Sequence, residues 1–164
     1  MSDENPHALD ERYVWFRLVG EFEPDDITAL TGLTPDHAFR KGTRPRPRAS
    51  VRKVSGWVVD SRLTPADEFH DHLTDLIALL RPCWDTLRSL GRTHQAFVGA
   101  AIYCHWSQGP MIQVSPEHSA SLADLGVTLD FDIYALPEEA PDDDGPRLLT
   151  RDELAKLDAS LREG

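Results

Sequence analysis

Hydrophobic and polar residues follow two different patterns in the middle of this chain. Residues 96–104 form an almost unbroken apolar run, which predicts a strand covered on both faces. Residues 127–134 alternate strictly between apolar and polar, which predicts a strand with one buried and one wet face. Between them, residues 111–114 predict a short strand and residues 115–125 a short helix. The rest of the fold is predicted to be organised around this stretch.

The N-terminal part of the chain carries a second set of elements. Residues 12–20 are rich in β-branched and aromatic side chains and predict a strand. Acidic residues in the first turn of residues 25–31 suit the positive end of a helix dipole, so a short helix is predicted there. Thr34 and Pro35 have the residue types of a helix N-cap and first position, and they predict the start of another helical turn.

The sequence then predicts a strand followed by a broken helix. Residues 55–63 form the strand, and Thr64 with Pro65 repeats the signature that starts a helix. Apolar residues of this helix recur at intervals of three and four, which predicts one buried face. Pro82 ends the helix after about Leu80, because its ring removes a donor and clashes with the preceding turn.

Taken in order, the elements predict an α+β fold, a two-layer sandwich of ferredoxin-like flavour. Its sheet is mixed or antiparallel with about five strands, and helices pack on that sheet. The apolar positions of the long helix and of the two central strands predict one shared core. Its predicted members are Leu73, Leu76, Ile77, Leu80, Phe97, Val98, Ile102, Leu129, Phe131 and Ile133.

A single domain is predicted over residues 12–136, because 164 residues are enough for one sizeable core. Residues 1–11 are polar and acidic and are predicted to fray. Residues 137–147 form an acidic, proline-rich linker that cannot bury itself. Residues 148–164 combine a capping box with a narrow leucine stripe, which predicts an amphipathic helix docked on the domain or on a partner.

The net charge of −11 limits the function classes, because a strongly acidic chain is a poor general binder of nucleic acid. Seven of the seventeen Lys and Arg residues nevertheless lie between Arg40 and Lys53, with no acid among them. Glycine and prolines alternate with these arginines, which predicts an extended, solvated loop. The loop either recognises carboxylates or phosphates or leans on the acidic body of the same protein. Its candidate binding residues are Arg40, Lys41, Arg44, Arg46 and Arg48.

The lack of a recognisable targeting signal and the small number of cysteines predict a cytoplasmic, bacterial-type protein that does not enter a membrane. The N-terminus lacks the apolar region of a signal peptide, and no run approaches the roughly 18 apolar residues of a membrane span. Two cysteines are too few for a disulfide framework. Cys83 and Cys104 occupy helical and strand positions that predict small core residues, with a disulfide between them as the alternative.

No convergent catalytic set is visible, so no catalytic residue, metal ligand or cofactor is predicted and a non-enzymatic role is favoured. His70 and His72 point away from each other on the predicted helix, so they cannot easily share one metal. Asp130 and Asp132 share one strand face, either as paired functional carboxylates or as the polar face of an antiparallel strand. A small-ligand binder or enzyme would have its site near Trp57, Asp130, Asp132 and Tyr134.

Four short motifs stand out: Leu-Thr-Gly-Leu-Thr-Pro at residues 30–35, Phe-Arg-Lys-Gly at 39–42, Gly-Trp at 56–57 and Asp-Ile-Tyr at 132–134. After an opening strand, this series resembles the bacterial family called domain of unknown function 4279. The similarity spans about residues 12–136. It implies no established activity, substrate or catalytic residue. Small acidic bacterial proteins of this sort often act as immunity or accessory proteins, which is an analogy at the level of the fold.

The leading hypothesis is a non-enzymatic protein that binds a partner protein, such as an immunity-type or accessory protein. The lack of a catalytic set supports it, as does an acidic body able to steer towards a basic partner. A homo-oligomer is a separate alternative. Two alternatives stay open: the small-ligand or enzyme site described above, and binding of an anion or nucleic acid through the Arg40–Lys53 loop.

Overall fold

The computed structural model describes residues 10–104 and 109–136, which form ten helices and strands. No helix in this part of the chain is long and apolar enough to cross a membrane. The predicted linker and C-terminal helix lie outside the described residues. The elements are, in order, β1 (Glu11–Gly20), α1 (Pro24–Thr31), β2 (His37–Phe39), β3 (Ser55–Asp60), α2 (Phe69–Leu80), the 3-10 helix η1 (Arg81–Cys83), α3 (Trp84–Leu90), β4 (Gln95–Cys104), α4 (Pro116–Leu125) and β5 (Thr128–Ala135).

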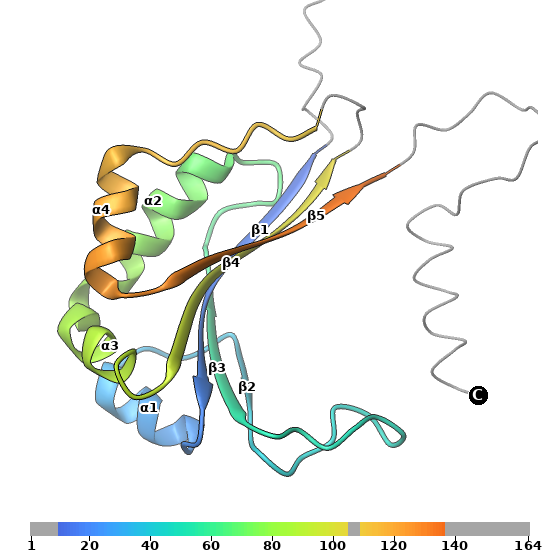
Figure 1. Cartoon of the computed structure of the whole chain (residues 1–164), viewed down its shortest axis with the longest axis vertical. Coiled ribbons are helices and arrows are strands. Elements are labelled where there is room, and N and C mark those ends of the chain that lie inside the picture. The colour runs from blue at the N-terminus through green and yellow to red at the C-terminus, as the bar shows by residue number, and fades with distance from the viewer. Residues whose placement is uncertain (1–9, 105–108, 137–164) are drawn as a thin grey trace, which may run out of the picture.

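The five strands form one mixed sheet in the order β2-β3-β1-β4-β5. β1 lies at its centre and pairs antiparallel with both β3 and β4, and β2 pairs antiparallel with β3. β5 runs parallel to β4, which requires a crossover connection, and α4 lies in that connection. The helices lie on one side of the sheet, so the domain has two layers (Figure 1). The predicted α+β fold with a five-stranded mixed sheet is confirmed.

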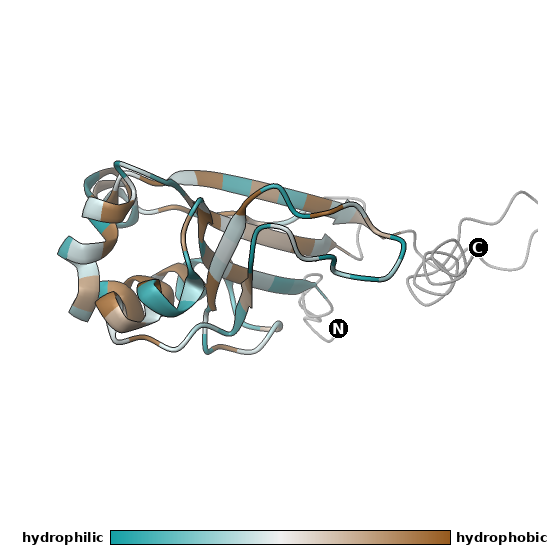
Figure 2. Ribbon diagram, turned by 90° about the horizontal axis from the view of Figure 1, so that it is seen from below, coloured by the Kyte–Doolittle hydropathy of each residue, from teal (hydrophilic) through white to brown (hydrophobic). Residues whose placement is uncertain are grey.

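The core lies between the sheet and the helices. Hydropathy alternates along the strands, because every second side chain points towards the helices (Figure 2). Trp57 is fully buried there, and its Nε1 donates to Thr28 Oγ1 at 3.1 Å, which satisfies the polar group of the indole. Cys83 and Cys104 are free and buried, as predicted for small core residues, and burial raises the pKa of both thiols. The strand residues of the core include Val14, Phe16, Leu18, Trp57, Val59, Val98 and Ile102.

Helix α2 has the predicted apolar face but not the predicted start. The helix begins at Phe69 and not at Pro65. Thr64 donates from its backbone N and its Oγ1 to Asp67 Oδ2, at 2.7 and 2.8 Å, and so closes a turn ahead of the helix. The helix ends at Leu80, as predicted, because the next turn contains a proline and is a 3-10 helix. Its buried residues are Phe69, His72, Leu73, Leu76 and Leu80.

The prediction of a helical turn at Thr34 and Pro35 was wrong. The chain there leads into the strand His37–Phe39, which pairs antiparallel with β3. The backbone N of Asp36 donates to the carbonyl of Val58 at 2.9 Å, which continues the ladder by one bond. Pairing with a neighbouring strand therefore decides the conformation of a segment whose own residues fit a helix start.

The predicted strand at residues 111–114 and the predicted burial of Phe131 and Ile133 were also wrong. Residues 111–114 form no strand, although Ile112 and Val114 pack against the core from an irregular segment. Phe131 and Ile133 are exposed by 36% and 50%, because β5 is an edge strand with only one sheet neighbour in the described structure.

Phe97 belongs to the opposite face of the sheet from the core. It is only partly buried, and it pairs in register with Arg17. Its neighbour Val98, by contrast, is buried in the core as predicted. The helices of the described residues therefore cover only one side of the apolar run 96–104, and the odd-numbered residues of the run face away from those helices.

The edge position of β5 gives a matched pair of substitutions. Phe69→Ala is expected to lower the free energy of unfolding by about 3–5 kcal/mol, as for a fully buried phenylalanine. Phe131→Ala is expected to lower the free energy of unfolding by only about 1–2 kcal/mol, because folding buries less of the Phe131 side chain than of the Phe69 side chain. Urea unfolding followed by circular dichroism measures both values. Equal losses for the two variants would contradict the described packing of β5.

Candidate functional site

The second face of the sheet carries no helix in the described structure, and we call it the open face (Figure 1). Side chains of a strand alternate between the two faces. Because Phe16 is buried against the helices, its neighbours Trp15 and Arg17 point to the open face. The register of the strands then assigns the remaining open-face positions. The aromatic residues among them are Tyr13, Trp15, Phe39, Phe97, Tyr103 and Tyr134.

The register places carboxylates on both sides of Trp15. Asp60 of β3 is its partner on one side, and Gly99 of β4 is its partner on the other. The next position beyond Gly99 is Asp130 of β5. A single row across the sheet therefore contains one indole and two carboxylates. The adjacent row consists of Tyr13, Ala101 and Asp132.

Two aromatic rings on the open face lie over glycines of neighbouring strands. A Cβ atom added to Gly99 would meet Trp15 Cε2 and Nε1 at 2.6 Å. A Cβ atom added to Gly56 would overlap the ring of Phe39. The absence of a side chain at both glycines lets the rings lie against the sheet, which fixes their position without help from a covering helix.

Ring contacts extend this arrangement across the whole face. Tyr103 and Tyr134 stack with a centroid distance of 4.9 Å, and Tyr13 meets Tyr103 edge-on at 6.1 Å. The guanidinium of Arg17 lies 5.2 Å from the ring centroid of Phe97. Such contacts hold large side chains in place on a surface that water can reach. Arg52 adds a similar contact with Phe39, at 4.1 Å.

A cleft of about 490 Å³ lies at the end of the sheet formed by β1, β2 and β3. Trp15, Arg17, His37 and Asp60 contribute to its lining. His37 Nε2 lies 3.4 Å from Asp60 Oδ2. Burial raises the pKa of Asp60, and the nearby carboxylate of Asp36 raises it further. The cleft therefore combines an aromatic wall with groups of both charges.

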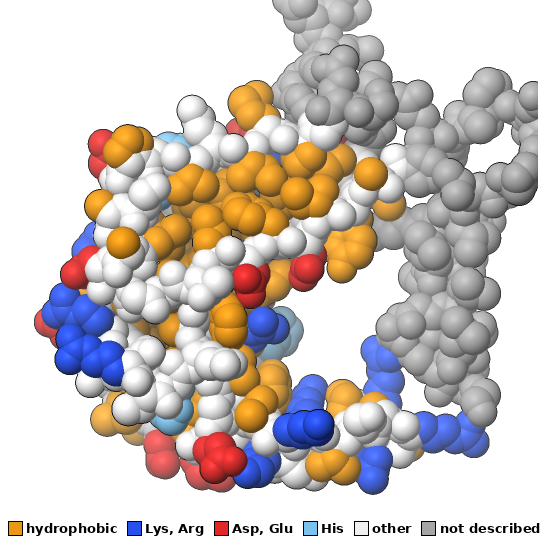
Figure 3. Space-filling model, in the orientation of Figure 1, with side chains coloured by type: hydrophobic (Ala, Val, Ile, Leu, Met, Phe, Trp, Pro, Cys, Tyr) orange, Lys and Arg blue, Asp and Glu red, His pale blue; other side chains and the backbone are white. Residues whose placement is uncertain are grey.

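The loop between β2 and β3, residues 40–54, is a hairpin that extends beyond the sheet and that we call the arginine hairpin. The backbone N of Gly42 donates to the carbonyl of Arg52 at 2.8 Å, and the backbone N of Arg52 donates to the carbonyl of Thr43 at 2.9 Å. The prediction of an extended loop is therefore refined, because its two arms are partly paired. Lys and Arg side chains gather on this projection, and the surface is hollowed between it and the sheet (Figure 3).

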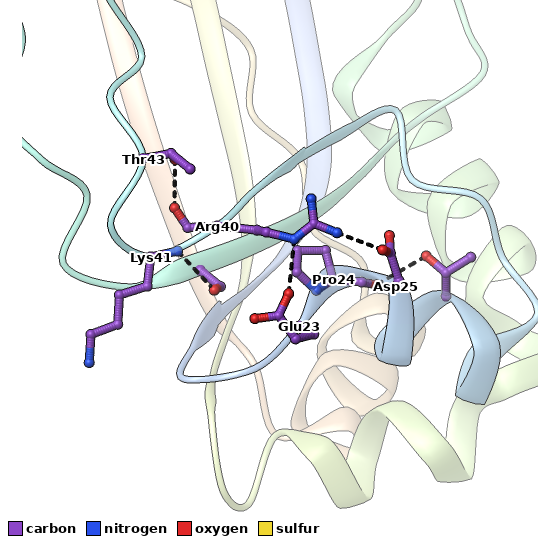
Figure 4. A network of polar contacts seen from close by, with 8 residues as sticks. Glu23, Pro24, Asp25, Arg40, Lys41 and Thr43 are labelled. Atoms are coloured by element: carbon purple, nitrogen blue, oxygen red, sulfur yellow. Dashed lines mark hydrogen bonds and ion pairs between the residues drawn. The ribbon is translucent and has the colours of Figure 1, made fainter.

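The base of the arginine hairpin is tied to acidic residues before and at the start of α1 (Figure 4). Arg40 donates from Nε to Glu23 Oε2 at 2.9 Å and from Nη2 to Asp25 Oδ2 at 2.5 Å. Lys41 Nζ contacts the carboxylate of Glu21. Both cations thus form ion pairs with carboxylates of the same molecule. Pairing within the molecule was one of the two interpretations of the loop offered by the sequence.

The outer part of the hairpin makes different contacts. Arg44 donates from Nη1 to the carbonyl of Ala49 at 2.7 Å, which braces the turn. The side chains of Arg44, Arg46 and Arg48 are exposed. These three residues are therefore the members of the predicted basic set that reach solvent at the projecting end.

The four residues predicted as a small-ligand or enzyme site do not meet. Asp130, Asp132 and Tyr134 lie on the open face of β5 and are exposed. Trp57 lies on the other face of the sheet, fully buried under α1, and β3 is separated from β5 by two strands. The indole that accompanies the carboxylates on the open face is that of Trp15.

Several open-face residues had a signal in the sequence that the prediction did not use. In the run Glu-Arg-Tyr-Val-Trp-Phe-Arg-Leu at residues 11–18, the even positions include Val14, Phe16 and Leu18, so the odd positions define the second face. Aromatic residues at these odd positions make the second face a candidate interface, because protein interfaces are enriched in aromatic side chains. The open-face residues that were missed are Tyr13, Trp15, Arg17, His37, Phe39, Asp60, Phe97 and Tyr103.

Another polar cluster, around His72, braces the fold. His72 Nδ1 lies 2.9 Å from Ser61 Oγ, and its Nε2 lies 3.1 Å from the carbonyl of Thr64. Ser61 Oγ in turn donates to Asp75 Oδ2 at 3.1 Å. Burial lowers the pKa of His72. Among residues 10–104 and 109–136, no group of three or more His, Cys, Asp or Glu side chains could hold a metal ion.

The described residues form a small α+β domain whose helices cover one side of the sheet. The chain belongs to the family described as Domain of unknown function (DUF4279), whose model matches residues 10–136. The resemblance carried by the short sequence motifs is thereby confirmed. No curated protein and no solved structure matches the chain. The function must therefore be argued from the geometry of the open face.

The contact between Trp15 and Gly99 gives a test of the open face. Gly99→Ala is expected to lower the free energy of unfolding by about 1–3 kcal/mol, because the new methyl group overlaps the indole. In a Trp15→Ala background the same substitution should cost much less, since the overlapping ring is gone. Urea unfolding of the four proteins of this cycle gives the coupling. Equal costs in both backgrounds would mean that the ring does not lie over Gly99.

The outer arginines give a second test. Replacing Arg44, Arg46 and Arg48 together by Ser is expected to lower the free energy of unfolding by no more than about 1–2 kcal/mol, because exposed charges stabilise little. Urea unfolding measures the change. A much larger loss would show that the hairpin clamps the fold and is not available for recognition.

Proposed function

We propose that this domain is a non-enzymatic binding protein that holds a partner protein against its open face. One observation carries the proposal: the open face, which no helix of the described residues covers, bears six aromatic side chains held by glycines, ring contacts and cations. An immunity-type or accessory role, in which the partner is held or inhibited, is the form of this function that we favour.

The residue types of the open face support a protein partner. Trp, Tyr, Phe and Arg are enriched at the centres of protein interfaces and supply most of the binding free energy there. Trp15 and Arg17 are partly buried on the open face, with their positions already fixed. Side chains that are ordered before binding lose less entropy when the partner arrives, which favours affinity.

The charges of the open face support a partner with two poles. Carboxylates of Asp130 and Asp132 lie on β5, at one end of the strand order, and the arginine hairpin lies at the other. A partner that presents basic groups to β5 and acidic groups to the hairpin would complement both. Complementary charges of this kind mainly set orientation and association rate.

A small ligand is the second candidate, because the cleft between β1, β2 and β3 is large enough to take one. Asp60 and Arg17 would then contact groups of opposite charge, and Trp15 would pack on an apolar part. Reproducible turnover of a small molecule by the isolated protein, abolished by Asp60→Asn, would favour this candidate over a protein partner.

Quantitative affinity capture from a lysate of the native host tests the proposal. Trp15→Ala is expected to lower the amount of a specifically retained partner at least tenfold, as for loss of a central aromatic anchor. Leu30→Ala is the matched control, because this exposed apolar residue lies on α1, behind the sheet. A partner retained equally by the Trp15 variant and by the wild type would overturn the assignment of the open face.

A further inference from the structure

The two edges of the sheet differ in length and protection. β2 forms one edge and has only three residues, whereas β5 forms the other and has eight. On its outer side β5 has no strand neighbour within residues 10–104 and 109–136. A long free edge is a template for another extended chain.

The backbone groups that face outward on β5 can be assigned. Leu136 donates its backbone N–H to the carbonyl of Cys104 at 2.7 Å, so its N–H points towards β4. Backbone groups of alternate residues in a strand point the same way. Asp130, Asp132 and Tyr134 therefore direct their N–H and C=O groups to β4. The outward set consists of Leu129, Phe131, Ile133 and Ala135.

β5 lacks the features that usually block such an edge. Its register with β4 is continuous from Thr128 to Ala135, so no bulge turns the edge away. It contains neither proline nor lysine. Its two charged residues are both acidic and both lie on the open face. The two carboxylates therefore repel an acidic chain at this edge, but they do not repel a basic one.

The side chains beside this edge define two different borders. Towards the helices, exposed Phe131 and Ile133 contribute to an apolar surface along β5 (Figure 3). Towards the open face, Asp130 and Asp132 lie two residues apart along β5. A strand added here would place alternate side chains on these two borders.

A second copy of the chain fits this edge poorly when the two copies pair around Phe131. A two-fold axis perpendicular to the sheet and centred at Phe131 would pair Asp130 of one copy with Asp132 of the other. Like charges directly opposite each other on neighbouring strands destabilise the pair. A different chain with cations at these positions would remove the repulsion and gain opposite-charge pairs instead.

We propose that the outer edge of β5 accepts an extended segment of the protein partner by strand addition. The segment alternates apolar residues, which cover Phe131 and Ile133, with Lys or Arg residues, which lie beside Asp130 and Asp132. Main-chain hydrogen bonds supply affinity in this mode, and the alternating side chains supply specificity. The inference rests on the proposed function, since it names the chemistry of one part of the same partner.

A synthetic nine-residue peptide of alternating Lys and Val, with blocked ends, serves as the probe against the full chain. Binding is followed by fluorescence anisotropy and by hydrogen exchange of single amides in NMR spectra. The amides of Leu129, Phe131 and Ile133 should exchange at least tenfold more slowly when the peptide is bound. The amides of Asp130 and Asp132 should change little, because β4 already accepts their hydrogen bonds.

Matched controls separate strand addition from simple charge attraction. Asp130→Lys combined with Asp132→Lys should weaken peptide binding about tenfold. Asp26→Lys combined with Asp85→Lys makes the same charge change on exposed helix residues and should weaken it much less. Phe131→Pro removes an outward N–H without removing a bond to β4, and should also weaken binding. A peptide with the same Lys and Val residues in two separate blocks should bind more weakly than the alternating one.

Several results would overturn the inference. Equal binding of the block peptide, an equal effect of the helix charge reversal, or no binding of the alternating peptide would each do so. If exchange of the outward amides slows when the protein concentration rises, with no peptide present, the edge binds a second copy of the chain instead. A natural partner that needs Trp15 but tolerates Phe131→Pro would remove strand addition and leave the proposed function standing.

Discussion

The helices described all pack against one face of the sheet, and this one-sided packing determines both the core and the candidate site. Strand side chains alternate, so half of every strand must face away from the helices. In β1 this division puts Phe16 and Leu18 into the core and leaves Trp15 and Arg17 on the open face. The same backbone therefore stabilises the fold with one set of residues and forms the open face with the other.

An aromatic surface in water needs local support to remain ordered. On the open face, Gly99 and Gly56 lack the side chains that would hold Trp15 and Phe39 away from the sheet. Each ring therefore packs against backbone and reduces its own exposure. A glycine within a strand normally weakens it, so the packed ring offsets part of that loss. Stability and preorganisation are thus supplied by the same contacts, which is why a stability test at Gly99 also reports on the site.

The sequence predicted the class of fold and most of the elements, because their periodicity is strong. The amphipathic face of α2 and its end before Pro82 follow from local chemistry alone. The prediction missed β2 because a strand of three residues is too short to show an alternation of apolar and polar residues. Its strand conformation depends on pairing with β3. The burial of Phe131 was overestimated because alternation gives the face of a strand but not its place in the sheet.

The candidate site was harder to predict than the fold for a related reason. In the apolar run Trp57-Val58-Val59, residues on both faces are apolar, so the pattern does not reveal which face Trp57 joins. Only its pairing with the buried Leu18 of β1 decides the matter. Acidic and basic residues that are distant in the sequence are brought together in the same way, by register and by strand order.

The distribution of charge follows from these pairings and bears on how a partner would approach. Carboxylates beside α1 neutralise Arg40 and Lys41 at the base of the arginine hairpin. The side chains of Arg44, Arg46 and Arg48 are exposed further out, and the carboxylates of β5 lie at the opposite edge of the sheet. The surface therefore has two poles despite the overall negative charge. Because exposed charges add little to affinity but strongly influence orientation, the poles would orient a partner whose binding free energy comes from the aromatic residues between them.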